Sequence, residues 1–227
     1  MTKLIEVENL YFKYKGSKYN ILDGVNFNLS RGEVVVIVGL SGSGKSTFLN
    51  IICGIIPYIY NGKIKGTVKV WGQKISSMRL SDISTKIGIV FQDPDIQLFS
   101  PTVEDEIAFG PENLMVDREE IGWRIKKILK VVGMEDYRYE NTNNLSGGQK
   151  QLIAMASVLV MEPGILLFDE VFAQLDKEGK KRISQVLMNL KEKGKSMILV
   201  EHDYNNIKFA DRIMELKDGK LQEFKGR

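Results

Sequence analysis

The chain has 227 residues, of which 43% are hydrophobic and 27% charged, a composition typical of a globular protein with one sizeable core. Its net charge of +3 comes from 32 basic and 29 acidic residues that are interleaved along the chain, so no nucleic-acid partner is expected. No apolar run approaches the roughly 20 residues that a bilayer span needs. The N-terminus also lacks the layout of a signal peptide, so we expect a cytoplasmic protein.

The first 30 residues alternate apolar and polar positions, with a break at residues 15–17, and predict antiparallel strands. Three continuous apolar runs predict strands buried on both faces of a largely parallel sheet. These runs are residues 34–38, 165–168 and 197–200. Helices must cover such a sheet, so the expected fold class is α/β. The single cysteine, Cys53, lies among isoleucines, which predicts a buried and inert thiol.

A glycine-rich sequence directly follows the first of these runs: residues 39–47 read GLSGSGKST and fit the G-x-x-x-x-G-K-[ST] template. Its glycines let successive N–H groups point into one concavity, and the following helix adds its positive end. Lys45 can reach the outer phosphates of a nucleotide, and the Ser46 hydroxyl can bind Mg²⁺. The alternative, a plain glycine-rich turn, is disfavoured by the full spacing. The predicted nucleotide-binding residues are Gly39, Leu40, Ser41, Gly42, Ser43, Gly44, Lys45, Ser46 and Thr47.

Between about residues 93 and 144 the pattern becomes helical. Helix starts are predicted at Thr102 and Asp117, each with an acidic residue three positions later, and the apolar stripe of the second helix predicts core packing. A further helix is predicted from Asp176 to Gly194, and a hairpin turn at residues 217–220. The expected division is one domain, 1–227, with a nucleotide-binding core (1–92 and 150–227) and an inserted helical subdomain (93–149).

Two carboxylates, Asp169 and Glu170, follow the run at 165–168 and therefore lie at the carboxyl end of a buried strand, where open α/β sheets bind ligands. Asp169 is the candidate for holding Mg²⁺, and Glu170 the candidate for polarising an attacking water as general base. The alternative is an acidic strand end exposed to solvent, which the phosphate loop upstream disfavours.

Residues 145–149 read LSGGQ and precede an apolar helix. Ser146, Gly147, Gly148 and Gln149 therefore lie at a second positive helix end, which can bind an anion. Without context, a plain serine N-cap would be the favoured interpretation.

Two single residues complete the candidates. His202, the only histidine, follows the run at 197–200 and is a candidate for donating a hydrogen bond to a transferred phosphate, although a lone histidine is usually structural or at the surface. Gln92 follows a strand-like segment and is a candidate link between the metal or water and the helical segment. An ordinary surface amide is the simpler interpretation of Gln92.

Taken together and in this order, the motifs resemble the ATP-binding subunit of an ABC transporter over nearly the whole chain. The resemblance equates 39–47 with Walker A, Gln92 with the Q-loop, LSGGQ with the signature, 165–170 with Walker B, 173–176 with the D-loop and His202 with the switch histidine. It implies a P-loop NTPase fold with a RecA-like core, an N-terminal antiparallel β subdomain and a helical subdomain. The implied cofactors are ATP and Mg²⁺, with Asp176 in the nucleotide site. Tyr14 is similar to the aromatic residue that stacks on adenine, although a tyrosine packed in the core is a rival interpretation.

The resemblance also implies partners. Two ATPase chains, identical or paralogous, would pair head to tail, so that residues 146–149 of one complete the site formed by Lys45 and Glu170 of the other. Segment 90–113 resembles more narrowly the energy-coupling factor ATPases of cobalt, nickel and vitamin importers, which act with a transmembrane subunit and a substrate-capturing membrane protein. The expected function is ATP hydrolysis that powers import of a micronutrient, at the inner face of the cell membrane.

The chain departs from the family pattern in two places: Val171 and Phe172 replace the usual Pro-Thr after the catalytic glutamate, and Leu152 stands where an arginine is common. The chain ends at Arg227, so an added carboxyl-terminal dimerisation domain is not expected. Two other functions remain open. One is an ATP-gated module of a soluble ABC machine acting on nucleic acid or ribosomes, and the other is a small-molecule kinase that shares only the phosphate loop.

Overall fold

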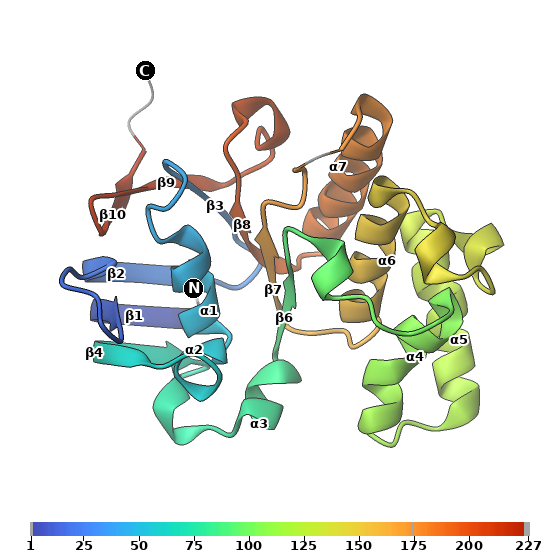
Figure 1. Ribbon diagram of the computed structural model, residues 1–227, viewed down its shortest axis with the longest axis horizontal. Coiled ribbons are helices and arrows are strands. Elements are labelled where there is room, and N and C mark those ends of the chain that lie inside the picture. The colour runs from blue at the N-terminus through green and yellow to red at the C-terminus, as the bar shows by residue number, and fades with distance from the viewer. Residues whose placement is uncertain (1, 174, 225–227) are drawn as a thin grey trace.

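The computed structural model describes residues 2–173 and 175–224. Gln174, within the expected D-loop, and the chain end at Arg227 lie outside these residues. Two β-sheets lie on either side of a short helix, and longer helices cover the far side of the second sheet (Figure 1).

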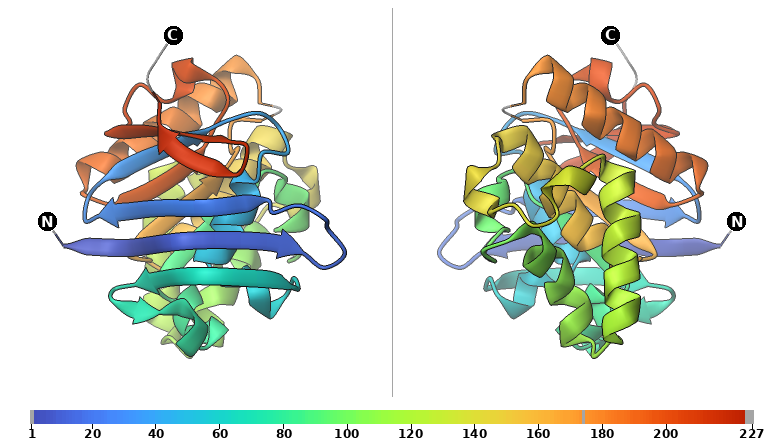
Figure 2. Two further views of the ribbon diagram at one scale, coloured as in Figure 1. Left: turned by 90° about the vertical axis from the view of Figure 1, so that its left-hand side faces the viewer. Right: turned by 90° about the vertical axis from the view of Figure 1, so that its right-hand side faces the viewer.

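The first sheet is antiparallel, as the alternating sequence predicts, and faces the viewer in the left panel of Figure 2. Its strand order is β2-β1-β4-β5. The strands are β1 (Lys3–Tyr14), β2 (Leu22–Ser30), β4 (Gly62–Val70) and β5 (Gln73–Lys74). Strands β1 and β2 are joined across the predicted break at residues 15–17.

The second sheet has the order β10-β9-β3-β8-β7-β6 and is parallel except for the β9–β10 pair. Its strands are β3 (Val34–Val38), β6 (Ile87–Val90), β7 (Ile165–Asp169), β8 (Ser196–Val200), β9 (Arg212–Lys217) and β10 (Lys220–Glu223). Asp218 and Gly219 form the predicted hairpin turn. Both have a positive φ, as the common two-residue turn between antiparallel strands requires.

The central strands divide their side chains between two cores. Val35 and Ile37 of β3 join a cluster with the antiparallel sheet and α1, whereas Val34, Val36 and Val38 join a cluster with α4 to α7. Strands β7 and β8 alternate in the same way. Continuous apolar runs are therefore buried on both faces, as predicted.

The helices begin where the capping residues predict. The Thr102, Asp117 and Asp176 side chains each accept a hydrogen bond from a backbone N–H in the first turn of α4, α5 and α7. The helices are α1 (Lys45–Ile52), α2 (Ile55–Tyr58), α3 (Leu80–Ser84), α4 (Val103–Asn113), α5 (Arg118–Val132), α6 (Gly147–Leu159) and α7 (Lys177–Glu192). Single 3₁₀ turns are η1 (Ile75–Ser77), η2 (Pro94–Ile96), η3 (Glu135–Tyr137), η4 (Thr142–Asn144) and η5 (Tyr204–Asn206).

Helix α6 links the two parts of the chain. It contacts α4 and α5 on one side and β6 and α7 on the other, as the right-hand part of Figure 1 shows. The predicted boundary between residues 149 and 150 falls within its first turn. The division into core and helical subdomain stays a prediction, and α6 runs continuously across it.

The single cysteine behaves as its neighbours in sequence predict. Cys53 is buried at the end of α1, and burial raises the pKa of its thiol to about 11. A thiol with so high a pKa carries almost no thiolate near neutral pH, so it is inert.

A bulge in β1 depends on a glycine in β4. Asn9 has a φ of 47° at the register shift between β1 and β4, and a Cβ on Gly66 (φ +95°) would lie 2.2 Å from the Asn9 carbonyl oxygen. We predict that Gly66→Ala lowers the free energy of unfolding in urea by about 2–4 kcal/mol, from strain and overpacking together. Gly16→Ala is the control, because Gly16 has φ +85° with nothing within 4 Å, and it should cost only about 1 kcal/mol. If the two variants lost the same free energy of unfolding, the predicted clash at Gly66 would be wrong.

Candidate active site

Loops from four parallel strands meet at one edge of the second sheet. Val90 of β6 pairs with Phe168 of β7, so Gln92 and Glu170 each lie two residues past the same rung of the ladder. Strand β8 adds His202 beside them, and β3 adds the phosphate loop. The carboxyl ends of parallel strands form the usual ligand site of an open α/β sheet, as the sequence predicts.

Lys45 is buried beneath the phosphate loop. Its Nζ donates to the carbonyl oxygens of Gly39 (3.0 Å) and Leu40 (2.9 Å), and lies 3.9 Å from Glu170 Oε1. Burial lowers the pKa of Lys45, while Glu170 and Asp169 act to raise it. The ammonium group is therefore held inside the loop, facing the two carboxylates.

The loop itself leaves no room for side chains at its start. A Cβ on Gly39 (φ +150°) would lie 2.4 Å from the Leu216 carbonyl oxygen, so the backbone of β9 and the loop approach closely only because residue 39 is glycine. Leu40 has an exposed side chain, and its carbonyl oxygen accepts from Lys45 Nζ. Ser43 Oγ is buried without a hydrogen-bond partner among the described residues, and a ligand oxygen in the loop could supply one.

The residues predicted to hold Mg²⁺ fit that ion. Asp169 is buried, and its Oδ1 has no hydrogen-bond partner in the described part of the chain. Burial raises the Asp169 pKa, and the hydrogen bond from Ser46 opposes this shift. A hydroxyl and a buried carboxylate are the oxygen ligands that Mg²⁺ accepts alongside phosphate oxygens. Gln92 lies at the same edge with an exposed side chain that makes no hydrogen bond within residues 2–173 and 175–224.

Glu170 and His202 are in direct contact. Glu170 has a φ of 48°, and its Oε1 lies 2.6 Å from His202 Nε2. Because a carboxylate only accepts hydrogen bonds, Nε2 donates in this contact. A left-handed backbone at a residue other than glycine costs about 1–2 kcal/mol, which is typical of a position fixed for function.

Sequence reasoning missed the residue that holds the histidine loop. Glu201 is buried, and its Oε1 accepts from the backbone N–H groups of His202 (2.8 Å) and Asp203 (2.9 Å). The carboxylate therefore orients the turn that carries the imidazole. An acid directly before the only histidine in the sequence is the signal that could have revealed this role.

The two residues that replace Pro-Thr are buried in the hydrophobic core. Val171 and Phe172 are both 2% exposed and pack into the cluster shared with α6 and α7. The Ala173 N–H donates to the Glu170 carbonyl at 2.9 Å and closes a turn around them. Apolar packing therefore supports the loop after Glu170.

Tyr14 lies beside the phosphate loop. Its hydroxyl lies 3.0 Å from Thr47 Oγ1, and its ring packs edge to face on Phe12 at 4.8 Å between centroids. The ring is half-buried, so it is partly core and partly open to a ligand. Stacking on adenine stays a prediction.

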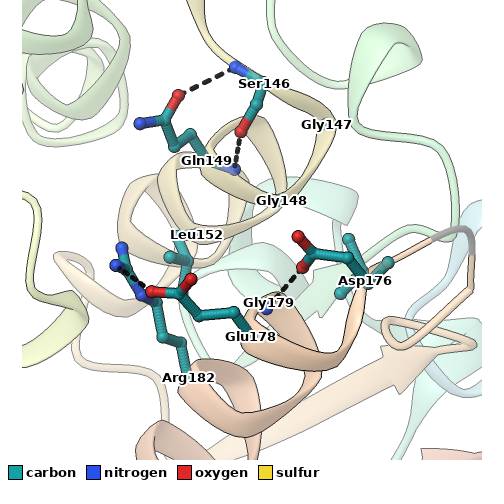
Figure 3. A pocket seen from close by; sticks show the side chains of 10 residues that line it. Ser146, Gly147, Gly148, Gln149, Leu152, Asp176, Glu178, Gly179 and Arg182 are labelled. Carbon is teal, nitrogen blue, oxygen red and sulfur yellow. Dashed lines mark hydrogen bonds and ion pairs between the residues drawn. The ribbon is translucent and has the colours of Figure 1, made fainter.

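The LSGGQ residues form a second, separate site (Figure 3). Ser146 Oγ accepts from the Gln149 N–H (3.3 Å), while Gln149 Oε1 accepts from the Ser146 N–H (2.8 Å), a complete capping box. The serine is thus an N-cap, whether or not an anion binds there. A pocket of about 390 Å³ opens at this helix end. It is lined by Ser146, Gly147, Gly148, Gln149, Leu152, Leu175, Asp176, Glu178, Gly179 and Arg182.

Asp176 also belongs to this second pocket. Its Oδ1 accepts from the Gly179 N–H at 2.7 Å, so it caps α7 (Figure 3). Leu152, which replaces the common arginine, is buried beside it. No residue of the phosphate loop lines this pocket, so within the described residues of one chain the LSGGQ site and Asp176 do not join the Lys45 site. Their predicted contact with the nucleotide stays a prediction.

The ABC transporter family profile matches residues 22–173, and the chain therefore belongs to this family. Its fold is that of the family's ATPases, as predicted. The structure of cbiO1 from Clostridium perfringens, described as part of the ABC transporter complex cbiONQ, superposes with a TM-score of 0.87 at 35% identity, over 97% of this chain and 87% of that one. A dimeric ATP-binding cassette bound to ADP and Pi in a post-hydrolysis state gives a TM-score of 0.83 at 32% identity, over 98% and 100% of the two chains.

Proteins with similar sequences belong to the same family. An ABC transporter ATP-binding protein of Pyrococcus abyssi is 46% identical over 96% of this chain and 79% of its own length. The energy-coupling factor transporter ATP-binding protein EcfA1 of Lactococcus lactis is 40% identical over 97% of this chain and 79% of its own. The chain spans only 34% and 38% of two longer relatives from Methanosarcina acetivorans and Methanosarcina mazei. None of the described helices is long and apolar enough to cross a membrane.

The buried Asp169 makes a stability prediction. Its raised pKa means that the folded chain holds this proton more readily than the unfolded chain, so the group's contribution to stability falls as pH rises through the titration range. We predict that Asp169→Asn raises the Tm of the nucleotide-free protein at pH 7 by roughly 2–4 °C, as expected for about 1 kcal/mol. The gain should shrink towards acidic pH.

Thermal unfolding followed by circular dichroism measures this effect. Asp82→Asn is the control and should give no gain, because Asp82 is only partly buried in α3 and is already paired with Arg79. An unchanged or lower Tm for Asp169→Asn at pH 7 would show that burial does not destabilise the carboxylate.

Proposed function

We propose that this chain binds and hydrolyses ATP to power import across the cell membrane, as a subunit of an energy-coupling factor type transporter. The observation that carries the proposal is the meeting of Lys45, Asp169, Glu170 and His202 at one edge of the sheet. These residues provide an anion cradle, a carboxylate for a metal and a candidate base in a single site.

In this proposal each group has one role. Lys45 leaves its two loop carbonyls for the outer phosphates, which neutralises charge on the group being transferred. Glu170 accepts a proton from the attacking water, a bond forms from that water to the γ-phosphorus, and the bond to the bridging oxygen breaks to release ADP. The His202 Nε2–H, which contacts Glu170 in this structure, would turn to donate a hydrogen bond to the transferred phosphate and leave the carboxylate free to act as base.

Mg²⁺ belongs to the same proposal. Ser46 and Asp169 would hold it, and Gln92 lies where it can contact the metal or the water. When bound there, Mg²⁺ would supply positive charge that offsets the negative charge developing on the phosphates. The unpartnered Oδ1 of Asp169 supports the presence of a cation.

The two separate anion sites support a head-to-tail dimer. The LSGGQ pocket carries the positive end of a 13-residue helix, yet no phosphate-loop residue reaches it within one chain. A second ATPase chain, identical or paralogous, would bring its nucleotide into this pocket. The dimeric state of the related ATP-binding cassette is consistent with such pairing.

An exposed apolar cluster supports docking to a transmembrane subunit. Ile96 is 72% exposed, and Phe99 (64%) packs edge to face on Phe109 (46%) at 4.6 Å between centroids. Large apolar groups gathered in one exposed place are typical of interaction sites. Ile96 and Phe99 lie between Gln92 and α4, and Phe109 lies within α4. A partner bound there would therefore contact the loop that leads from the catalytic edge.

Import of a micronutrient, either a metal ion or a vitamin, is the narrower part of the proposal. It rests on the likeness to EcfA1 and to cbiO1, whose names and descriptions place them in transporter complexes. The chain would then work with a substrate-capturing membrane protein and lie on the inner face of the membrane.

Glu170→Gln tests the hydrolytic site. Glutamine keeps the shape of the side chain but cannot take a proton, so kcat should fall about 10²- to 10⁴-fold while ATP binding is retained. Phosphate release and fluorescent-nucleotide binding measure the two effects. Glu135→Gln, exposed in η3, should keep its turnover. Undiminished turnover in Glu170→Gln would remove this residue from the role of base.

Phe99→Asp tests the docking cluster. An aspartate in the apolar cluster should weaken association with the membrane subunit at least tenfold, which corresponds to about 1.4 kcal/mol. Co-purification in detergent measures association, and ATP binding should be unchanged. Tyr139→Asp is the matched control, since Tyr139 is 73% exposed on the same subdomain but lies outside the cluster. Equal co-purification of the two variants would contradict the assignment.

A further inference from the structure

The segment from Phe91 to Gln97 is fastened to α6 by side-chain amides. The Phe91 N–H donates to Gln97 Oε1 (3.1 Å), and Gln151 Nε2 donates to the Phe91 carbonyl oxygen (3.0 Å). Gln97 Nε2 in turn donates to the carbonyl oxygen of Ala154, within α6 (3.1 Å). Glutamine side chains therefore bond both the N–H and the carbonyl oxygen of Phe91. Gln151 is part of α6, and Gln97 is bonded to it through Ala154.

An ion pair adds a further attachment in the middle of the segment. Lys150 Nζ lies 2.6 Å from Asp95 Oδ1, and the Lys150 side chain is only 19% exposed. Gln151 is 2% exposed, and a buried amide that loses its hydrogen-bond partner destabilises the fold. The attachment is therefore buried at Gln151 and is not easily exchanged for water.

Gln92 follows Phe91 directly, while its own side chain is exposed. Lys150 and Gln151 lie in the first turns of α6, immediately after the LSGGQ residues that form its N-terminus. The backbone that carries Gln92 and the second anion site are thus parts of one connected unit.

We propose that Gln97 and Gln151 are positioning residues that make Gln92 move with the LSGGQ end of α6. A displacement at either place is then transmitted to the other through the peptide of Phe91. The inference rests on the proposed hydrolysis, in which Gln92 contacts the metal or the water, and it adds the residues through which the second site controls that contact.

A double-mutant cycle tests the proposal on the full chain with Mg²⁺ and ATP. Gln151→Met keeps the length of the side chain and removes the donor to Phe91. It should lower kcat by roughly 3- to 30-fold, a range typical of mutations that weaken such a link, with nucleotide affinity unchanged. In a Gln92→Ala background, Gln151→Met should lower kcat no further, because both changes act through the same contact.

Thr142→Val is the matched control. The Thr142 hydroxyl is buried and donates to the Ser100 carbonyl at 2.7 Å, so its loss also leaves a buried group unpaired but leaves the Phe91 attachment intact. It should lower Tm about as much as Gln151→Met while changing kcat less than twofold. Three results would each overturn the proposal: effects that multiply in the double variant, an unchanged kcat in Gln151→Met, or an equal loss of kcat in Thr142→Val.

Failure of the proposed function gives a different result. If the wild-type chain hydrolyses no more ATP than Glu170→Gln, hydrolysis itself is wrong, and hydrogen exchange then tests the link. The Phe91 amide should exchange at least tenfold faster in Gln97→Met than in Thr142→Val, because only the first change removes its acceptor. Equal exchange rates would overturn the link without any measurement of activity.

Discussion

Strands β3, β7 and β8 each bury five consecutive side chains, and this double burial decides where the loops that carry Lys45, Glu170 and His202 lie. Strands covered on both faces must run side by side in the middle of the sheet, so their carboxyl ends open at the same edge. The chemistry of the site follows from what the sequence places immediately after each strand. The phosphate loop with its lysine, the two carboxylates and the histidine meet at this edge, although no sequence pattern links these distant segments to one another.

The electrostatics of that edge oppose folding and favour binding. The buried Lys45 Nζ lies 3.9 Å from Glu170 Oε1. The preceding residue, Asp169, has a carboxylate oxygen, Oδ1, that has no hydrogen-bond partner within the described residues. Both groups have pKa values shifted by burial towards their neutral forms. A polyphosphate would place negative charge beside the lysine, and a divalent cation would place positive charge beside the aspartate. Binding of both would therefore offset the cost of burying these two charged groups.

Sequence predicted the parts whose signal is local. The phosphate loop, the doubly buried strands, the caps at Thr102, Asp117 and Asp176, and the hairpin at 217–220 each depend on residues next to one another, and all are present. Strand β4 was missed because its first residues are largely exposed and only Val68 and Val70 carry the buried pattern. The roles of Gln97 and Gln151 were also missed, because an amide that bonds to backbone groups six or more residues away leaves no periodic trace. The role of Glu201 was missed although its partners are the next two residues, because a single acid carries no periodic signal either.

The loop after Glu170 shows how one constraint can replace another. A proline would restrict that backbone covalently and equally at every temperature. Here Val171 and Phe172 restrict it by being buried, and burial of apolar surface loses strength on cooling. The packing that holds residues 171–172 in place therefore weakens on cooling, together with the rest of the core.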